Sequence, residues 1–170
     1  HGTTYGGNPF VCAAVSKVFD IYENDKIIEH VQETAPYLEQ KLDELVEKGV
    51  PFTIATASPK INIDFYFEYF KLDRWFKYEE IIYDDGTFPG KPDPTIYEKA
   101  AESLGLDPKD CLVLEDAVTG IQSANSANIG KVIIMVSSDE QKEFYEKSDL
   151  KYDAIITDFN NFLEKYIELT

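Results

Sequence analysis

The sequence has few of the residues that build disulfides, zinc sites or nucleic-acid interfaces. It contains two cysteines and two histidines, and no histidine has a cysteine or a second histidine at ligand spacing, which argues against zinc. Cys12 and Cys111 stand alone in apolar surroundings, so we expect both to be buried, reduced thiols. Sixteen basic residues accompany 32 acidic ones, and the net charge of -16 disfavours binding to nucleic acid or to anionic membranes.

Long apolar segments are also lacking. No run approaches the ~18 apolar residues that a membrane-spanning helix needs. The first residues lack the charged and apolar regions of a signal peptide, so a cytoplasmic location is expected. A chain of 170 residues with 44% hydrophobic content is long enough for one packed domain, or for one domain and an appended piece.

The first 48 residues show the apolar spacing of two amphipathic helices. Asn8-Pro9 is a helix-start signal, and apolar residues recur at helical intervals from there to Tyr22. A second helix is predicted over residues 25–48, ending at Gly49. Pro36 lies inside it and should kink or split it.

After Gly49 the sequence alternates between short apolar runs and helical patterns. Ser58-Pro59 is predicted to start one helix, and Asp93 to cap another that closes at Gly105. Such alternation predicts parallel strand pairing in an α/β fold. The expected strands are PFTIATA, EEIIYDD, CLVLED, KVIIMV and AIIT.

Polar residues follow the ends of these predicted strands. Thr56 and Ser58 end the first strand, Lys91 lies in the loop before the PTIYEK helix, and Glu115 and Asp116 end the CLVLED strand. In open parallel sheets, ligands gather where strands end and helices begin. Hydroxyl and backbone N–H groups bind phosphate, a lysine neutralises its charge, and carboxylates bind Mg²⁺. The set predicts a site for a phosphate and a magnesium ion.

From about Gly49 to Phe162, these motifs resemble the haloacid dehalogenase-like (HAD) superfamily, in particular its phosphatase and β-phosphoglucomutase branch. The resembling strings are TIATAS, GKPDPTIY and LVLEDAVTGIQSA. The resemblance implies a three-layer, Rossmann-like core, a phosphate held by Thr56 and Lys91, and Mg²⁺ held by Glu115 and Asp116. Each signal alone has a simpler explanation: Thr56 as an ordinary strand residue, Lys91 as a solvated charge, and the two acids as a cap of the next helix.

The nucleophilic aspartate of that family has no counterpart here. In the family it lies on an earlier strand, between the strand of Thr56 and that of Glu115. Asp85 and Asp158 follow apolar runs, but neither has the spacing of the family's first motif. Because strands lie ~4.8 Å apart, a missing strand would open a gap of roughly 10 Å. We expect a new pairing, another segment or another chain to fill it.

The N-terminal residues resemble a different family, the class III pyridoxal-phosphate-dependent aminotransferases, through HGTTYGGNP and the helices that follow. That resemblance implies that Thr4 contacts a cofactor phosphate. The Schiff-base lysine is missing, so pyridoxal phosphate is not expected to bind the isolated chain. Taken alone, YGGNP is equally a turn before a helix. The expected organisation is an aminotransferase-like helical segment over 1–48 and a HAD-like core over 49–170, as in a fusion.

Three functions follow as hypotheses. The leading one is a Mg²⁺-dependent phosphatase or phosphomutase domain for a small phosphorylated metabolite, impaired by the absent nucleophile. The second is a non-catalytic module that binds phosphate and metal or another protein. The third is a fragment of an aminotransferase. Unpaired strand edges also lead us to expect self-association as a homo-oligomer.

Overall fold

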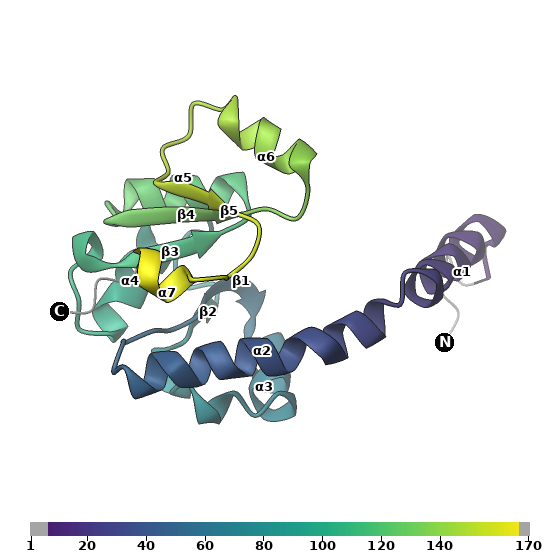
Figure 1. Ribbon diagram of the computed structural model, residues 1–170, viewed down its shortest axis with the longest axis horizontal. Coiled ribbons are helices and arrows are strands. Elements are labelled where there is room, and N and C mark those ends of the chain that lie inside the picture. Colours follow the sequence, from purple (N-terminus) through teal and green to yellow (C-terminus); the bar gives the residue numbers. More distant parts are fainter. Residues whose placement is uncertain (1–6, 167–170) are drawn as a thin grey trace. The chain divides into compact units, whose positions relative to one another are not determined.

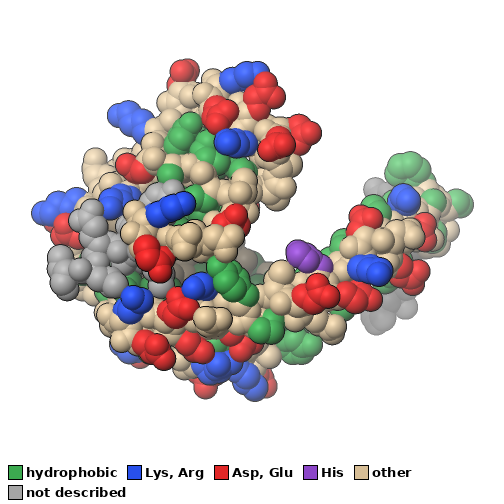
Figure 2. Space-filling view, viewed as in Figure 1, with side chains coloured by type: hydrophobic (Ala, Val, Ile, Leu, Met, Phe, Trp, Pro, Cys, Tyr) green, Lys and Arg blue, Asp and Glu red, His purple; other side chains and the backbone are tan. Residues whose placement is uncertain are grey.

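A computed structural model describes residues 7–166, apart from the side chains of Leu163 and Tyr166. The chain divides into two compact units, His1–Gly49 and Val50–Thr170. No described helix is both long enough and apolar enough to cross a membrane. On the face that Figure 2 shows, acidic and basic side chains are interspersed rather than gathered into one charged patch.

The first unit consists of two helices, α1 (Pro9–Asn24) and α2 (Ile27–Glu47). The Asn8 side chain accepts hydrogen bonds from the backbone N–H groups of Phe10 and Val11, so the predicted N-cap is confirmed. Neither helix has a buried residue. Cys12 is exposed, so its predicted burial is wrong: the apolar face of α1 that surrounds it is itself open to solvent.

Helix α2 runs unbroken through Pro36, so of the two expected outcomes the split is wrong and the kink stays a prediction. A proline removes one backbone hydrogen bond and crowds one carbonyl, and a 21-residue helix retains the turns on either side.

The second unit is an α/β fold with parallel strand pairs, as predicted (Figure 1). One sheet pairs β1 (Ala55–Pro59) with β2 (Ile82–Asp84), and the other has the order β3-β4-β5. The bounds of the second sheet are β3 Leu112–Glu115, β4 Lys131–Met135 and β5 Ala154–Ile156. Its predicted strands are therefore confirmed.

The strands are connected in sequence by helices α3 (Lys60–Tyr69), α4 (Thr95–Ser103), α5 (Val118–Ser126) and α6 (Asp139–Glu146), and α7 (Phe162–Tyr166) follows β5. Short 3₁₀ turns lie at Leu72–Arg74, Tyr78–Glu80 and Pro108–Asp110. Ser58 does not cap α3 as predicted. The strand continues through Pro59, which itself occupies the N-cap position with no side-chain hydrogen bond.

The core lies between β4 and helices α4 and α5. Ile121 and Ala124 of α5 and Ile134 of β4 are fully shielded from solvent. Ile96 and Tyr97 of α4 belong to the same cluster, and Ala55 of β1 and Ile82 of β2 pack against it. Helix α4 also contacts both β1 and β2. It therefore joins the two sheets into one unit.

Among the described residues, β1 and β3 share no ladder, because the two sheets are separate. This is the place where the sequence leads us to expect a missing strand. No described segment fills it with a new pairing, which leaves another segment or another chain as the expected occupant.

Candidate functional site

The carboxyl end of β3 carries a compact polar cluster of Lys91, Tyr97 and Glu115. Lys91 comes from the loop after β2, Tyr97 from the first turn of α4, and Glu115 from the last position of β3. The Lys91 ammonium forms an ion pair with Glu115 Oε1 and donates to the Tyr97 hydroxyl at 3.0 Å, and the Tyr97 hydroxyl donates to the same carboxylate oxygen. The Lys91 and Glu115 side chains are only 15% and 7% exposed.

Both Glu115 oxygens already have hydrogen-bond partners. Oε2 accepts from the backbone N–H groups of Asp116 at 3.1 Å and Ala117 at 3.3 Å, next to the start of α5. Burial raises the pKa of the Glu115 carboxyl, but the hydrogen bonds from Lys91 and Tyr97 and the lysine charge outweigh it, so the pKa lies below its usual value. Glu115 is therefore a carboxylate, and it holds Lys91 in place.

The Tyr97 hydroxyl stays protonated in this cluster. Burial, followed by the hydrogen bond to Glu115, raises its pKa far above the usual value. It acts as a fixed donor between helix α4 and strand β3. Ion pairs of low exposure are sensitive to the loss of one partner, because the other charge is then left without compensation.

Gly120 gives the Glu115 carboxylate its space. A Cβ at this position would overlap both Glu115 oxygens and its carboxyl carbon. The first turn of α5 can therefore pass over the carboxylate only with glycine at residue 120. The sequence motif contains this glycine, but spacing alone does not reveal that it contacts the acid.

Asp116 follows Glu115 at the end of β3, and its charge acts on two nearby tyrosines. Its backbone carbonyl accepts a hydrogen bond of 2.6 Å from Tyr145 of α6. Burial, followed by the charge of Asp116, raises the pKa of Tyr145, and the same charge contributes to the raised pKa of Tyr97. Asp116 is thus close to both tyrosines, although nothing in the sequence pattern identifies either tyrosine as part of the site.

Thr56 and Ser58 lie at the other sheet, in β1. Thr56 Oγ1 accepts from the Ser58 backbone N–H at 3.1 Å, and both residues line a cavity of about 100 Å³ with Ile63 and Tyr66 of α3. No hydrogen bond among the described residues joins either of them to Lys91. Their convergence with Lys91 on one phosphate stays a prediction.

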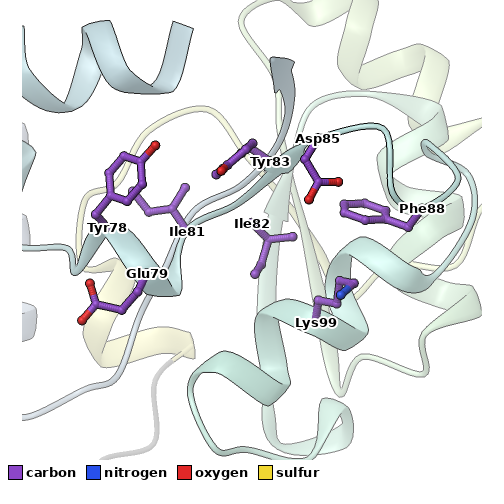
Figure 3. Close-up of a pocket in the computed structure, with 8 residues that line it drawn as sticks. All are labelled: Tyr78, Glu79, Ile81, Ile82, Tyr83, Asp85, Phe88 and Lys99. Atoms are coloured by element: carbon purple, nitrogen blue, oxygen red, sulfur yellow. The ribbon is translucent and has the colours of Figure 1, made fainter. Parts of the chain in front are cut away.

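The remaining candidates lie elsewhere or outside the described part. Asp85 accepts from the Thr87 backbone at 2.9 Å and hydroxyl at 2.6 Å, and it lines a second cavity of about 210 Å³ beside Phe88 and Lys99 (Figure 3). Asp158 accepts from the Asn160 backbone at 2.7 Å, as in a turn. Thr4 lies outside the described residues.

The residues present do not by themselves make a metal site. Within residues 7–166, no three acids, histidines or cysteines come together as a ligand group. Glu115 has both oxygens engaged, so of the predicted pair Asp116 is the carboxylate left to bind an ion. Mg²⁺ often binds through one or two carboxylates together with substrate phosphate and water. Asp116 alone does not supply enough ligands for Mg²⁺, so a bound phosphate would have to supply others.

The second unit belongs to the class of parallel α/β proteins, which bind ligands where strands end and helices begin, and here a lysine and two carboxylates lie at such a position. The particular family follows from comparison with known proteins: a haloacid dehalogenase-like hydrolase model matches residues 5–128, and the chain belongs to that family. The match includes α1 and α2. The aminotransferase resemblance of this segment stays a prediction.

Three similar proteins illustrate the relationship. The chain is 31% identical over 137 residues to a haloacid dehalogenase-like hydrolase domain-containing protein of Arabidopsis thaliana, covering 80% of this chain and 42% of that protein. It is 36% identical over 109 residues to a bifunctional riboflavin kinase/FMN phosphatase of the same plant, covering 64% and 28%. A β-phosphoglucomutase-type structure from Thermotoga maritima superposes with a TM-score of 0.65 at 25% identity, covering 76% and 59%. The chain thus spans less than half the length of these two plant relatives.

Proposed function

We propose that this chain carries the phosphate-binding part of a HAD-type phosphatase or phosphomutase site and acts, with Mg²⁺, on a small phosphorylated metabolite. The observation that carries the proposal is the Lys91 ammonium, held at low exposure by Glu115 and Tyr97 at the end of β3. A cation fixed in this way is preorganised for an anion. Similarity to an FMN phosphatase and to a phosphoglucomutase-type protein supports a phosphorylated small molecule as the ligand class.

Each residue then has a distinct role. Lys91 neutralises phosphate charge, and Thr56 with Ser58 donates hydrogen bonds from the neighbouring sheet. Asp116 supplies a carboxylate for Mg²⁺, which would contribute charge neutralisation when bound. Glu115, predicted as a second metal ligand, holds Lys91 in the structure, so it would have to give up one of its hydrogen bonds to bind a metal.

We expect the chain by itself to turn over very slowly, because its sequence lacks the family's nucleophilic aspartate. Hydrolysis of p-nitrophenyl phosphate with and without Mg²⁺ measures this. Substantial Mg²⁺-dependent turnover that disappears in Asp116→Asn would show that our expectation of low activity is wrong, while supporting the site assignment.

Binding can be tested independently of turnover. Titration calorimetry with inorganic phosphate and Mg²⁺ should give heat for the unaltered chain and none for Lys91→Met, with Lys109→Met as a matched surface control. Lys109 pairs with Asp107 on the surface and is 69% exposed. Because Lys91→Met leaves Glu115 without its cation, a thermal melt must show that this variant is folded. Equal heats for both variants at millimolar phosphate would remove Lys91 from the site.

A second candidate is a phosphate-binding module without chemistry. The hydrogen bonds of Glu115 favour this candidate, because both carboxylate oxygens already have partners within the protein and neither is open to a metal ion. Phosphate heat that is unchanged by Mg²⁺, together with no hydrolysis, would select this candidate over the enzyme.

A further inference from the structure

The cavity of about 210 Å³ lies along β2, on the side away from β1, and shares no lining residue with the candidate phosphate site. Its lining comes from the 3₁₀ turn before β2, from β2 and the loop after it, and from helix α4 (Figure 3). Three aromatic residues, two acids and one lysine line it: Tyr78, Tyr83, Phe88, Glu79, Asp85 and Lys99. This combination can bind a ligand that is both apolar and charged.

The backbone of β2 has a free hydrogen-bonding edge beside this cavity. The Ile82 N–H donates to the Ile54 carbonyl at 2.9 Å, and Asp84 is also paired with β1. Because neighbouring residues of a strand direct their backbone groups to opposite sides, Tyr83 directs its N–H and C=O away from β1. No residue in the described part of the chain bonds to these two groups. The cavity therefore lies next to an unpaired strand edge.

The inner wall of the cavity is apolar and fixed by the core. Ile81 is 4% exposed, and Ile82 and Phe88 pack against the core cluster. A cavity of about 150 Å³ is large enough to hold benzene, so this larger one has room for an aromatic side chain. Phe88 and Tyr83 offer ring contacts to such a side chain.

The two acids lie at opposite ends of the cavity. Figure 3 shows Glu79 before β2 at one end and Asp85 after β2 at the other. Both are exposed, and Thr87 contacts Asp85 through Oδ1. Residues 77–87 contain four acids and one lysine, so the surroundings of the cavity are acidic as well. Positive groups at both ends of a ligand would complement this arrangement.

We propose that the cavity and the Tyr83 backbone bind an extended segment of another protein, with one aromatic residue that enters the cavity and a basic residue on each side of it. We call the cavity and this backbone edge together the edge groove. An extended segment is required because it can pair with the N–H and C=O of Tyr83 at once, as when a peptide adds a strand to a sheet. The proposal is independent of the phosphate site.

Charge argues for a different protein rather than a second copy of this chain. The net charge of -16 makes two copies repel each other, and the acids beside β2 would meet like charges. Charged residues at a strand edge also discourage pairing with neutral or acidic strands. The acids of the edge groove thus select a basic partner.

The probe is a capped synthetic peptide, KTVFVTK. Its sequence is the same in both directions, so the phenylalanine and the two lysines fit the edge groove whether the peptide runs parallel or antiparallel to β2. Two control peptides separate the contributions. ETVFVTE reverses the charges, and KTVAVTK removes the aromatic side chain.

The readout is amide hydrogen exchange of the full chain at single residues. Without peptide, the Tyr83 amide should exchange fast, while the Ile82 amide is protected by its bond to Ile54. Saturating KTVFVTK should slow exchange at Tyr83 about fivefold, the factor for one net hydrogen bond, and leave Ile82 unchanged. Neither control peptide at the same concentration should protect Tyr83.

A pair of double variants tests the acids. Glu79→Gln with Asp85→Asn should weaken binding of KTVFVTK about threefold to tenfold, the effect of two exposed ion pairs. The asparagine keeps an oxygen that can accept from Thr87. Asp73→Asn with Asp110→Asn removes the same charge from exposed positions outside the cavity and should change binding less. All four sites lie outside the phosphate site, so phosphate binding should stay the same in both double variants.

Four results would overturn the proposal. Absence of Tyr83 protection at millimolar KTVFVTK would mean that the peptide does not pair with β2. Slow exchange at Tyr83 in the free chain at every concentration would mean that the edge is already covered, and slow exchange that disappears on dilution would assign it to a second copy of this chain. Equal affinity for KTVFVTK and ETVFVTE would mean that the acids do not select the partner.

Discussion

Strands β3 and β4 lie side by side and have similar apolar sequences, yet they differ sharply in burial. In β4, Val132 is 2% exposed and the two isoleucines after it are fully buried. In β3, Leu112 and Val113 are only half-buried and Leu114 is 41% exposed. The difference lies in their neighbours: within residues 7–166, β4 has a strand on each side, whereas β3 has a strand on one side. Burial in a parallel sheet depends on sheet position as much as on side-chain type.

The largest expected effect is in β4. Ile133→Ala removes a fully buried side chain between two strands, so we expect a loss of about 2–5 kcal/mol in the free energy of unfolding. Phe10→Ala is the control, because Phe10 is 83% exposed on α1 and should change stability by less than about 0.5 kcal/mol. Chemical denaturation measures both. Equal losses of unfolding free energy in the two variants would contradict the difference in burial between β4 and α1.

The order of the elements in the second unit could be predicted from sequence because each apolar run has turn or capping signals around it. Gly105 follows the end of α4 with a positive φ, as the pattern predicts. At the other end the N-cap position is Pro94 rather than the predicted Asp93, whose carboxylate accepts from the Thr95 backbone N–H one residue further on. Burial could not be predicted in the same way. The apolar spacing of α1 is typical of a packed helix, but its partner surface is not encoded in the helix itself, so Cys12 and Phe10 are exposed.

The candidate site could be predicted only in part. Lys91 and Glu115 were identified from their places after strands, and the structure brings them into contact. The sequence does not identify Tyr97 as part of the site, because a tyrosine on the inner face of a helix usually belongs to the hydrophobic core. Only the structure shows that its hydroxyl donates a hydrogen bond to Glu115. Only the structure shows that both Glu115 oxygens accept hydrogen bonds, because two adjacent acids in a sequence do not reveal their partners.

The second effect concerns the end of β3. Gly120→Ala places a methyl group where the Glu115 carboxylate lies, so the acid must move away from Lys91. We expect a loss of about 1–3 kcal/mol from overpacking. Gly90→Ala is the matched control, since a Cβ there meets no atom within 4 Å and the residue does not require positive φ. Thermal melts compare them. A neutral Gly120→Ala would show that the carboxylate can shift freely.

The third effect tests the exposure of β3 directly. Leu114→Ala should cost about 1 kcal/mol, well below Ile133→Ala, because much of the leucine already contacts solvent. Denaturant midpoints of the two variants measure the difference. A cost as large as that of Ile133→Ala would mean that Leu114 is covered in solution.

The smallest effect concerns α4, which joins the two sheets. The Asp93 carboxylate accepts from the Thr95 hydroxyl and backbone N–H, which lowers its pKa. A carboxyl with a lowered folded-state pKa contributes stability above its unfolded pKa of about 3.9, and this contribution is lost as pH falls through the folded value. Asp93→Asn should therefore lower the melting temperature slightly at pH 7, and the difference should shrink as the pH falls through the lowered folded-state pKa. Asp73→Asn removes the same charge from an exposed turn and corrects for the general effect of net charge. If the two variants differed equally from the parent chain at every pH, the hydrogen bonds between Asp93 and Thr95 would contribute nothing to the stability of the helix that connects the sheets.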